Sequence, residues 1–273
     1  MKRTVFFVSD RTGITVKTLG GSLLTQFESM DLERVSIPYV DTPEKAEAAV
    51  RRIDAAAEAD GVPALVFSTL IDPECRAVLV SANGVLFDFF DTFIGPLETA
   101  LGMRSSRTVG RTHGMGNATD YQVRMNAVNY ALNLDDGVHS GRLDQADVVL
   151  LGVSRSGKTP TCLYLGLEFG IHAANYPLTE EDFEKGRLPE AVRPLKGRLA
   201  GLTIAPERLH EIREERRAGS RYASLKQCRY EVDEAERLMR RDRIPIIDTT
   251  HASIEEIATM LVHEHGLRRR VVR

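Results

Sequence analysis

The residues with the most specific chemical pattern lie just past the middle of the chain. Consecutive residues there fit the pattern G-x-x-x-x-G-K-[ST]: Gly152-Val153-Ser154-Arg155-Ser156-Gly157-Lys158-Thr159. Glycines let backbone N–H groups turn inward around phosphate oxygens, and the N-terminus of a following helix adds a partial positive charge. In such a loop the ammonium group of Lys158 can bridge the terminal phosphates, and the hydroxyl of Thr159 can bind Mg²⁺. The pattern therefore predicts a site for the phosphates of a nucleotide.

The residues on either side of this loop support the prediction. The apolar run Asp147 to Leu151 is typical of a buried strand, and Thr159 to Glu168 has the spacing of a helix. Pro160 falls in the first helical turn, where its missing N–H costs little. The alternative is an ordinary strand-to-helix turn that contains two glycines and a lysine by chance.

Phosphoryl transfer also needs a group that orients the attacking oxygen, so we expect a carboxylate near the loop. Asp135 and Asp136 end a predicted helix, Asn117 to Leu134, shortly before the strand that enters the loop. The fold could therefore bring one of them beside the terminal phosphate, where it would be catalytic. The alternative for this acidic pair is a solvated helix end followed by a turn.

Two further residues are candidates for the same chemistry. Asp248 ends the apolar run Ile244 to Ile247, and a carboxylate at the end of a buried parallel strand suits an indirect contact to Mg²⁺. Its alternative role is the N-cap of a predicted helix, Thr249 to Val262. His113 lies in the glycine-containing loop Arg111-Thr112-His113-Gly114, where it could contact phosphate or a protein substrate, or simply be a structural histidine.

Two other stretches could bind anions or a partner. Ser9-Asp10-Arg11-Thr12-Gly13 follows the first predicted strand and precedes a helix, so its N–H groups and Arg11 could receive inorganic phosphate; an ordinary turn is the alternative. The arginine-rich stretch Arg208 to Arg229 is a candidate lid or docking face, with a solvated helical surface as the alternative. His263 and His265 lack H-E-x-x-H spacing, so no zinc site is predicted.

Short apolar runs alternate with helical patterns along the chain. Predicted strands are Val5 to Val8, Val35 to Val40, Ala64 to Phe67, Val85 to Phe89, Asp147 to Leu151, His172 to Asn175, Leu199 to Ile204 and Ile244 to Ile247. Predicted helices between them include Val16 to Phe27, Pro43 to Ala59, Leu70 to Ala82 and Pro96 to Leu101. This alternation predicts an α/β fold: an N-terminal, mainly parallel α/β domain over residues 1–141, followed by a P-loop-type α/β kinase domain over residues 142–273.

Composition excludes several classes of protein. The chain has 273 residues, of which 42% are hydrophobic and 27% charged, as in globular proteins. A net charge of -3 gives no overall attraction to nucleic acid or to an anionic membrane. The widely spaced cysteines form no disulfide or metal pattern, and Asp10 interrupts the apolar N-terminal run before a signal-peptide core is complete. We therefore expect a cytoplasmic protein without a membrane or nucleic-acid partner. An α/β protein with an arginine-rich helical surface is compatible with a homodimer but does not demand one.

Further motifs extend the phosphate-loop pattern over nearly the whole chain. They are Val8-Ser9-Asp10-Arg11-Thr12-Gly13-Ile14-Thr15, Arg111-Thr112-His113-Gly114, Asp135-Asp136-Gly137, Leu150 to Thr161, Ala173-Ala174-Asn175-Tyr176-Pro177, Arg213-Glu214-Glu215-Arg216-Arg217 and Arg221-Tyr222-Ala223-Ser224-Leu225. With these motifs the chain resembles the phosphoenolpyruvate synthetase regulatory proteins. The resemblance implies a bifunctional enzyme whose partner is pyruvate, water dikinase. One activity is an ADP-dependent serine/threonine kinase that inactivates the dikinase on a threonine, and the other uses inorganic phosphate to remove that phosphoryl group as pyrophosphate.

Three alternatives remain at this point. Close relatives in the family act on pyruvate, phosphate dikinase instead. A phosphate-loop kinase could also phosphorylate a small molecule without any protein acceptor. A non-catalytic nucleotide sensor would need the loop but no correctly placed carboxylate. Ordinary protein kinases are excluded, because the sequence lacks their H-R-D and D-F-G signatures.

Overall fold

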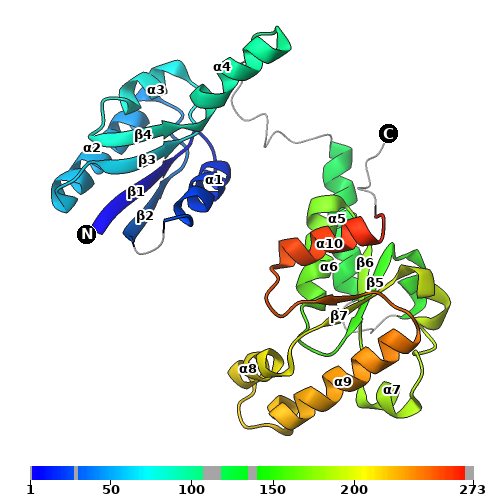
Figure 1. Ribbon diagram of the computed structural model, residues 1–273. Helices are drawn as coiled ribbons and strands as arrows, with labels where there is room; N and C mark the ends of the chain where they lie inside the picture. The colour runs from blue at the N-terminus through cyan, green and yellow to red at the C-terminus, as the bar shows by residue number, and fades with distance from the viewer. Residues whose placement is uncertain (1, 28–29, 107–117, 135–139, 268–273) are drawn as a thin grey trace. The chain divides into compact units, whose positions relative to one another are not determined.

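The computed structural model describes residues 2–27, 30–106, 118–134 and 140–267, and it divides into two compact units. The first unit is Met1–Gly114 and the second is Met115–Arg273. Within the described residues each unit contains a four-stranded parallel sheet with helices on both faces (Figure 1). The predicted α/β class with mainly parallel strands is therefore confirmed.

The first unit is built around the strand order β2-β1-β3-β4. Its elements are β1 (Lys2–Val8), α1 (Ile14–Leu24), β2 (Asp31–Ile37), α2 (Pro43–Asp60), β3 (Ala64–Ser68), α3 (Pro73–Leu79), β4 (Gly84–Asp88) and α4 (Phe89–Leu101). Helices α2 and α3 share a core with Phe6 and Val66 on one face of the sheet. Helix α1 packs Val16 against Phe7 on the other face. The unit is thus a three-layer arrangement of helix, sheet and helix.

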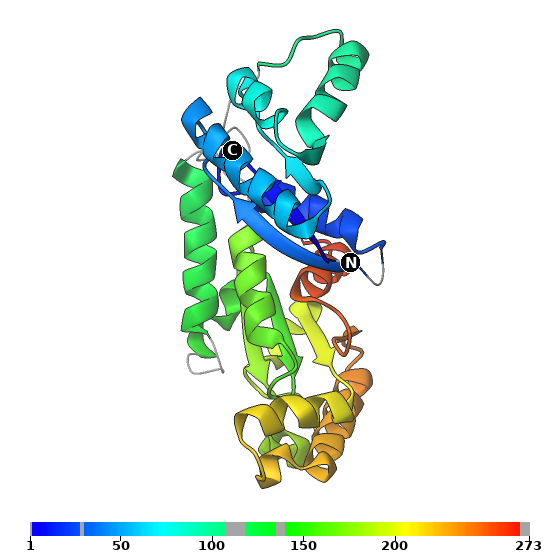
Figure 2. The same cartoon turned by 90° about the vertical axis from the view of Figure 1, so that its left-hand side faces the viewer.

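The second unit repeats this architecture with the strand order β6-β5-β7-β8. Its elements are α5 (Ala118–Asn133), the 3₁₀ segment η2 (Ser140–Gln145), β5 (Val148–Gly152), α6 (Lys158–Phe169), β6 (Ala173–Pro177), α7 (Glu180–Lys185), η3 (Arg193–Arg198), β7 (Leu199–Thr203), α8 (Pro206–Arg216), η4 (Arg221–Ala223), α9 (Leu225–Arg241), β8 (Ile246–Asp248) and α10 (Ile254–Glu264). Helices α6 and α10 cover one face of the sheet, and α7, α8 and α9 cover the other (Figures 1 and 2).

The structural division falls before α5, whereas the sequence suggested a boundary between residues 141 and 142. Helix α5 runs directly beside α6: a Cβ built on Gly166 of α6 would lie 3.0 Å from the backbone nitrogen of Val128 in α5. The ring of Tyr130 in α5 also stacks on His172, with 4.6 Å between the centroids. Because α5 packs in this way, it belongs to the second unit. The sequence Asp135-Asp136-Gly137 suggested a boundary, but a sequence signal for a turn carries no information about packing.

Most predicted elements lie close to observed ones, and the exceptions have local causes. The helix expected from Pro96 begins already at Phe89, because Asp88 caps it by accepting a hydrogen bond from the backbone nitrogen of Asp91 at 2.9 Å. Helix α7 was not predicted, although Thr179 and Asp182 form a capping box at its start. No helix in the described ranges combines the length and apolar character needed to cross a bilayer.

The two sheets share one connectivity. In each sheet the strand that comes first in the sequence, β1 or β5, is an inner strand. The strand that follows it in the sequence pairs with it on one side, and the third strand in the sequence pairs with it on the other side. The loop that leaves the first strand is therefore at a topological switch point, where ligands bind in open parallel sheets. Ser9–Gly13 occupies this position in the first unit and residues 153–157 occupy it in the second.

Helix α1 approaches the first sheet at a single glycine. A Cβ at Gly20 would lie 2.7 Å from the ring of Phe7 and 3.0 Å from the ring of Phe67, whereas a Cβ at Gly21 would meet nothing within 4 Å. Phe67 cannot easily move, because its ring also stacks on Phe87 at a centroid distance of 5.0 Å. Close packing of this helix therefore requires glycine at position 20 and not at position 21.

We expect Gly20→Ala to lower the free energy of unfolding by about 1–3 kcal/mol, because the added methyl group displaces packed rings. Gly21→Ala is the matched control, and it is expected to raise the free energy of unfolding by up to about 1 kcal/mol, since alanine is the better helix former. Urea denaturation measures both values. Equal effects of the two substitutions would contradict this account of the packing.

Candidate functional site

The predicted phosphate loop forms the connection between β5 and α6. Gly152 ends β5 with φ +155, and a Cβ at this position would lie 2.4 Å from the backbone oxygen of Leu202 in β7. Gly157 stands just before α6 with φ 87, in the left-handed region. Both glycines of the motif are therefore required by the backbone, one for a close approach to the neighbouring strand and one for the turn into the helix.

The loop has the features of an anion cradle. Helix α6 carries no acidic residue in its first turn, so no carboxylate of that turn offsets the partial positive charge of its N-terminus. The side chain of Ser156 is buried, and its Oγ has no hydrogen-bond partner among the described residues. A buried hydroxyl without a partner is costly, and a phosphate oxygen would satisfy it. This arrangement fits a bound nucleotide phosphate.

Lys158 lies across the loop rather than in solvent. Its side chain is buried, and its Nζ donates a hydrogen bond of 2.7 Å to the backbone oxygen of Val153. The ammonium group therefore lies at the place where phosphates would enter. Lys158 therefore lies within the loop, where it is predicted to contact the phosphates.

Thr159 is held by a residue from the neighbouring strand. The Nδ2 atom of Asn175 in β6 donates to Thr159 Oγ1 at 3.1 Å, and Asn175 is only 1% exposed. The register of the sheet sets Asn175 beside Leu150 of β5, which brings its side chain to the loop. The sequence showed Asn175 only as part of a family motif. One signal could have identified Asn175 as part of the site: it is a polar residue near the carboxyl end of a strand that neighbours β5.

The turn from β8 to α10 also reaches the loop, but not through Asp248. Thr249 Oγ1 donates to the backbone oxygens of Thr203 at 2.9 Å and of Ser156 at 3.3 Å. Asp248 is exposed, and its Oδ1 accepts a hydrogen bond of 2.9 Å from the backbone nitrogen of Thr250. Asp248 therefore shapes the turn, and an indirect contact to Mg²⁺ stays a prediction.

The alternative role of Asp248, as a helix N-cap, was wrong. Ser253 caps α10 instead: its side chain accepts from the backbone nitrogen of Glu256 at 3.2 Å, while the Glu256 carboxylate accepts from the backbone nitrogen of Ser253 at 2.8 Å. A helix starts where such a reciprocal pair is available, and this pair lies five residues beyond the end of β8.

A cavity of about 660 Å³ lies beside this turn. It is lined by Asp248, Thr250, His251, Ala252, Glu255, Glu256, Thr259 and Met260. Its volume falls within the range of small-molecule sites. Because the wall carries several carboxylates, the cavity does not suit the phosphates of a nucleotide, which are better placed in the loop itself.

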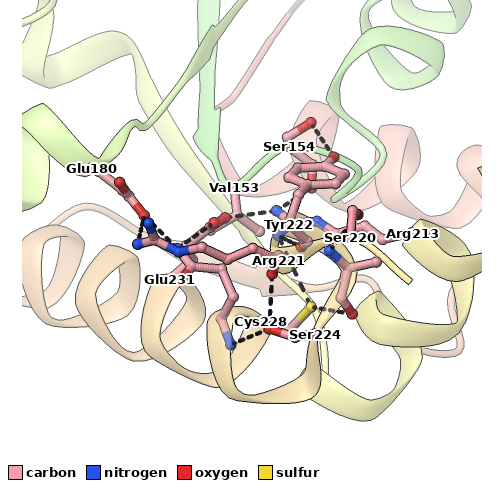
Figure 3. A network of polar contacts seen from close by, with 12 residues as sticks. Val153, Ser154, Glu180, Arg213, Ser220, Arg221, Tyr222, Ser224, Cys228 and Glu231 are labelled. Carbon is pink, nitrogen blue, oxygen red and sulfur yellow. Dashed lines mark hydrogen bonds and ion pairs between the residues drawn. The ribbon is translucent and has the colours of Figure 1, made fainter. Parts of the chain in front are cut away.

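The arginine-rich stretch divides into an exposed part and a buried residue. Arg221 and Arg229 are exposed and lie in ion pairs, with Glu180 at 3.1 Å and with Glu207 at 2.8 Å. Arg213 of α8 is fully buried and lies beside Ser154 of the phosphate loop (Figure 3). For Arg213 the alternative of a solvated helical face was wrong, and a lid role of the stretch stays a prediction. A docking role of the exposed arginines stays a prediction.

The predicted catalytic carboxylates, Asp135 and Asp136, lie outside the described residues, and so does His113. The chain on either side of the acidic pair is described: α5 ends at Asn133 and η2 begins at Ser140, both in the second unit. The catalytic roles of these three residues therefore remain predictions.

The corresponding turn of the first unit contains a buried acid. Asp10 is 6% exposed, and its Oδ2 has no hydrogen-bond partner among the described residues. Burial raises the pKa of this carboxyl group above its ordinary value, and hydrogen bonding to the backbone of Ile71 and of Asp10 itself offsets only part of that effect. Arg11 is exposed, and Gly13 precedes α1 in the left-handed region with φ 76. Binding of inorganic phosphate here stays a prediction.

Comparison with known proteins defines the class to which this chain belongs. The model of the kinase/pyrophosphorylase family matches residues 5–262, so the chain is a member of that family. It is 56% identical over 270 residues to a protein of Halorhodospira halophila, covering 98% of each chain. It is 52% identical to a protein of Pseudomonas aeruginosa over 99% of this chain and 98% of the relative, and 52% identical to one of Legionella pneumophila over 99% and 100%.

All three relatives bear the name "Putative phosphoenolpyruvate synthase regulatory protein". The resemblance stated from the sequence motifs is thereby confirmed at the level of the family. The likeness covers both units, since the matched residues run from β1 to α10.

The buried carboxyl group of Asp10 predicts a pH-dependent stability. Its pKa is higher in the folded chain than in the unfolded chain, so its ionisation destabilises the fold as pH rises through the folded pKa. We expect Asp10→Asn to be more stable than the wild type at pH 7, with a difference that shrinks towards pH 4 and disappears below it. Urea denaturation across this pH range measures the difference.

Asp41→Asn is the control of opposite sign. A hydrogen bond from Lys45 lowers the pKa of Asp41, so its removal should slightly destabilise the chain at pH 7 and have less effect in acid. If Asp10→Asn were no more stable than the wild type at pH 7, burial would not be the dominant influence on this carboxyl group.

Proposed function

We propose that this protein is an ADP-dependent protein-threonine kinase and a phosphate-dependent pyrophosphorylase. In this role it inactivates and reactivates pyruvate, water dikinase, which is phosphoenolpyruvate synthase. The observation that carries the proposal is the glycine loop between β5 and α6, with Lys158 and Thr159 at its helical end. Membership of the kinase/pyrophosphorylase family and the names of the relatives support it.

In the kinase direction, the hydroxyl oxygen of the target threonine attacks the terminal phosphorus of ADP. The bond from that phosphorus to the bridging oxygen breaks, AMP leaves, and the hydroxyl proton passes to a carboxylate. The N–H groups of the loop and the ammonium group of Lys158 neutralise the charge of the diphosphate. Mg²⁺, which the hydroxyl of Thr159 would help to hold, supplies further neutralisation when bound.

In the reverse direction, an oxygen of inorganic phosphate attacks the phosphorus of phosphothreonine. The bond to the threonine oxygen breaks, that oxygen takes up a proton, and pyrophosphate leaves. Both directions place a phosphate group beside the phosphoryl group that moves, so a single loop can hold either ADP or the phosphate co-substrate. Asp136, or its neighbour Asp135, accepts the proton in one direction and returns it in the other.

The proposed target also implies a location. Because the target is a metabolic enzyme, we place the protein in the cytoplasm with this dikinase as its protein partner. The thiol of Cys75 is compatible with that location: burial raises its pKa to about 11, so it stays protonated and unreactive.

The direct test incubates the purified chain with Mg²⁺, either ADP or ATP, and each candidate dikinase, and maps phosphothreonine by mass spectrometry. Transfer from ADP to pyruvate, water dikinase is the expected result. Transfer only to pyruvate, phosphate dikinase would change the partner. Phosphorylation of a metabolite alone would indicate a small-molecule kinase, and nucleotide-dependent binding without transfer would indicate a sensor.

We expect Lys158→Ala to lower the kinase rate by about 10²-fold or more, because it removes a preorganised charge from the transferring phosphates. The exposed Lys226→Ala is the matched control and should retain the wild-type rate. Initial rates of phosphothreonine formation provide the measurement. A near-normal rate for Lys158→Ala would remove the loop from the mechanism.

Asp136→Asn should abolish both the forward and the reverse activity, because one carboxylate handles the proton in each. Its affinity for ADP, measured by calorimetry, should stay close to that of the wild type. Asp144→Asn, which changes an exposed residue of η2, is the control and should keep both activities. If Asp136→Asn remained active in both directions while folded, the assignment would be wrong.

A further inference from the structure

Arg213 is a buried cation of the second unit that the proposed reaction does not use. Its side chain is 0% exposed. A buried charge is costly unless it is paired and hydrogen-bonded, and even a paired one seldom stabilises a fold more than apolar residues of the same volume would. The Nε atom of Arg213 is buried without a hydrogen-bond partner among the described residues, so the site is not optimised for stability alone.

Arg213 links one residue of the phosphate loop to α9 and to Tyr222 (Figure 3). Its Nη2 donates to the backbone oxygen of Ser154 at 3.1 Å and to the carboxylate of Glu231 in α9 at 2.7 Å. Its Nη1 donates to the backbone oxygen of Tyr222 at 3.0 Å, and its guanidinium carbon lies 4.0 Å from the centroid of the Tyr222 ring. Arg213 is thus fixed in orientation by an ion pair on one side and an aromatic ring on the other.

Tyr222 reaches the same loop residue. Its hydroxyl lies 2.9 Å from Ser154 Oγ, at hydrogen-bond distance. The backbone of Ser154 is therefore held by Arg213 and its side chain by Tyr222, and these two residues come from the consecutive segments α8 and η4. We call Arg213 and Tyr222 together the brace.

The bond to the backbone oxygen matters for what the loop can bind. The carbonyl of Ser154 and the N–H of Arg155 belong to one peptide group, and a cation at the oxygen polarises that group and strengthens its N–H as a donor. It also fixes the plane in which that N–H points. Arg155 has φ 76, a left-handed conformation that is uncommon outside glycine, so this part of the loop needs support from its surroundings.

We propose that Arg213 and Tyr222 are positioning residues for the phosphate loop: they hold the peptide group between Ser154 and Arg155 in the orientation that binds the nucleotide phosphates. The proposal rests on the proposed function of the loop as a phosphate site. The competing explanation is that Arg213 only joins α8 to α9 through Glu231. That explanation predicts a loss of stability without any change in nucleotide binding.

Tyr222→Phe separates the two explanations most cleanly, because it keeps the ring beneath Arg213 and removes only the hydroxyl that meets Ser154. We expect its dissociation constant for ADP with Mg²⁺, measured by calorimetry, to rise about 3- to 10-fold, as for the loss of one hydrogen bond. Its thermal melting temperature should stay near that of the wild type. Tyr230→Phe, at an exposed tyrosine of α9, is the matched control and should bind ADP like the wild type.

Arg213→Lys keeps the charge but loses the planar group that joins Tyr222, Glu231 and Ser154. We expect ADP binding about 10-fold weaker or worse, together with a lower kcat for phosphothreonine formation. Arg208→Lys, at an exposed arginine of α8, is its control. If Arg213→Lys does not fold, a double-mutant cycle of Tyr222→Phe with Ser154→Ala still tests the proposal. Since both substitutions remove the same contact, the dissociation constant of the double variant for ADP should not exceed the larger of the two single-variant values.

The proposal is overturned if Tyr222→Phe and a folded Arg213→Lys bind ADP as tightly as the wild type, or if the effects of Tyr222→Phe and Ser154→Ala simply add. These measurements also distinguish a failure of this proposal from a failure of the proposed function. A wild type that binds ADP but transfers no phosphate would disprove the kinase, while the comparison of affinities would still test the brace. A wild type without affinity for ADP would overturn both.

Discussion

A phosphate loop depends on the orientation of its peptide groups, because backbone N–H groups are among its main donors. In this chain the loop's carbonyl groups are held from several directions. Lys158 of α6 bonds to the oxygen of Val153, Arg213 of α8 to that of Ser154, and Thr249 of the β8–α10 turn to that of Ser156. The loop is therefore held by its own helix and by two segments distant in sequence, which the fold of the second unit brings to it.

This arrangement has an energetic cost as well as a geometric benefit. Arg213 and Lys158 are both buried, and removing a cation from water is expensive even when hydrogen bonds compensate for it. The hydroxyl of Ser156 is also buried without a partner among the described residues. Buried donors of this kind favour the binding of an anion, and local strain is typical of functional loops.

The sequence predicted the class of fold, the loop and its flanking elements, because a buried strand and the two required glycines leave clear local patterns. It did not identify Arg213 or Thr249 as parts of the site, since their roles depend on which helices and strands become neighbours. An arginine-rich helix is usually a solvated face, and only packing shows that one of its arginines is buried. The domain boundary differed for the same reason: α5 joins the second unit through its contact with α6, which no turn signal records.

The shared connectivity of the two units has a consequence for recognition. Thr12, Gly13 and Thr15 stand in the first turn where the second has Ser156, Gly157 and Thr159, but the position of Lys158 is taken by Ile14, which is 60% exposed. The first turn thus shares the left-handed glycine before its helix but lacks the ammonium group, and it contains the buried carboxyl group of Asp10. One topology, used twice in a single chain, therefore presents different ionisable groups at its two turns, and chain topology alone does not determine which ions a turn will accept.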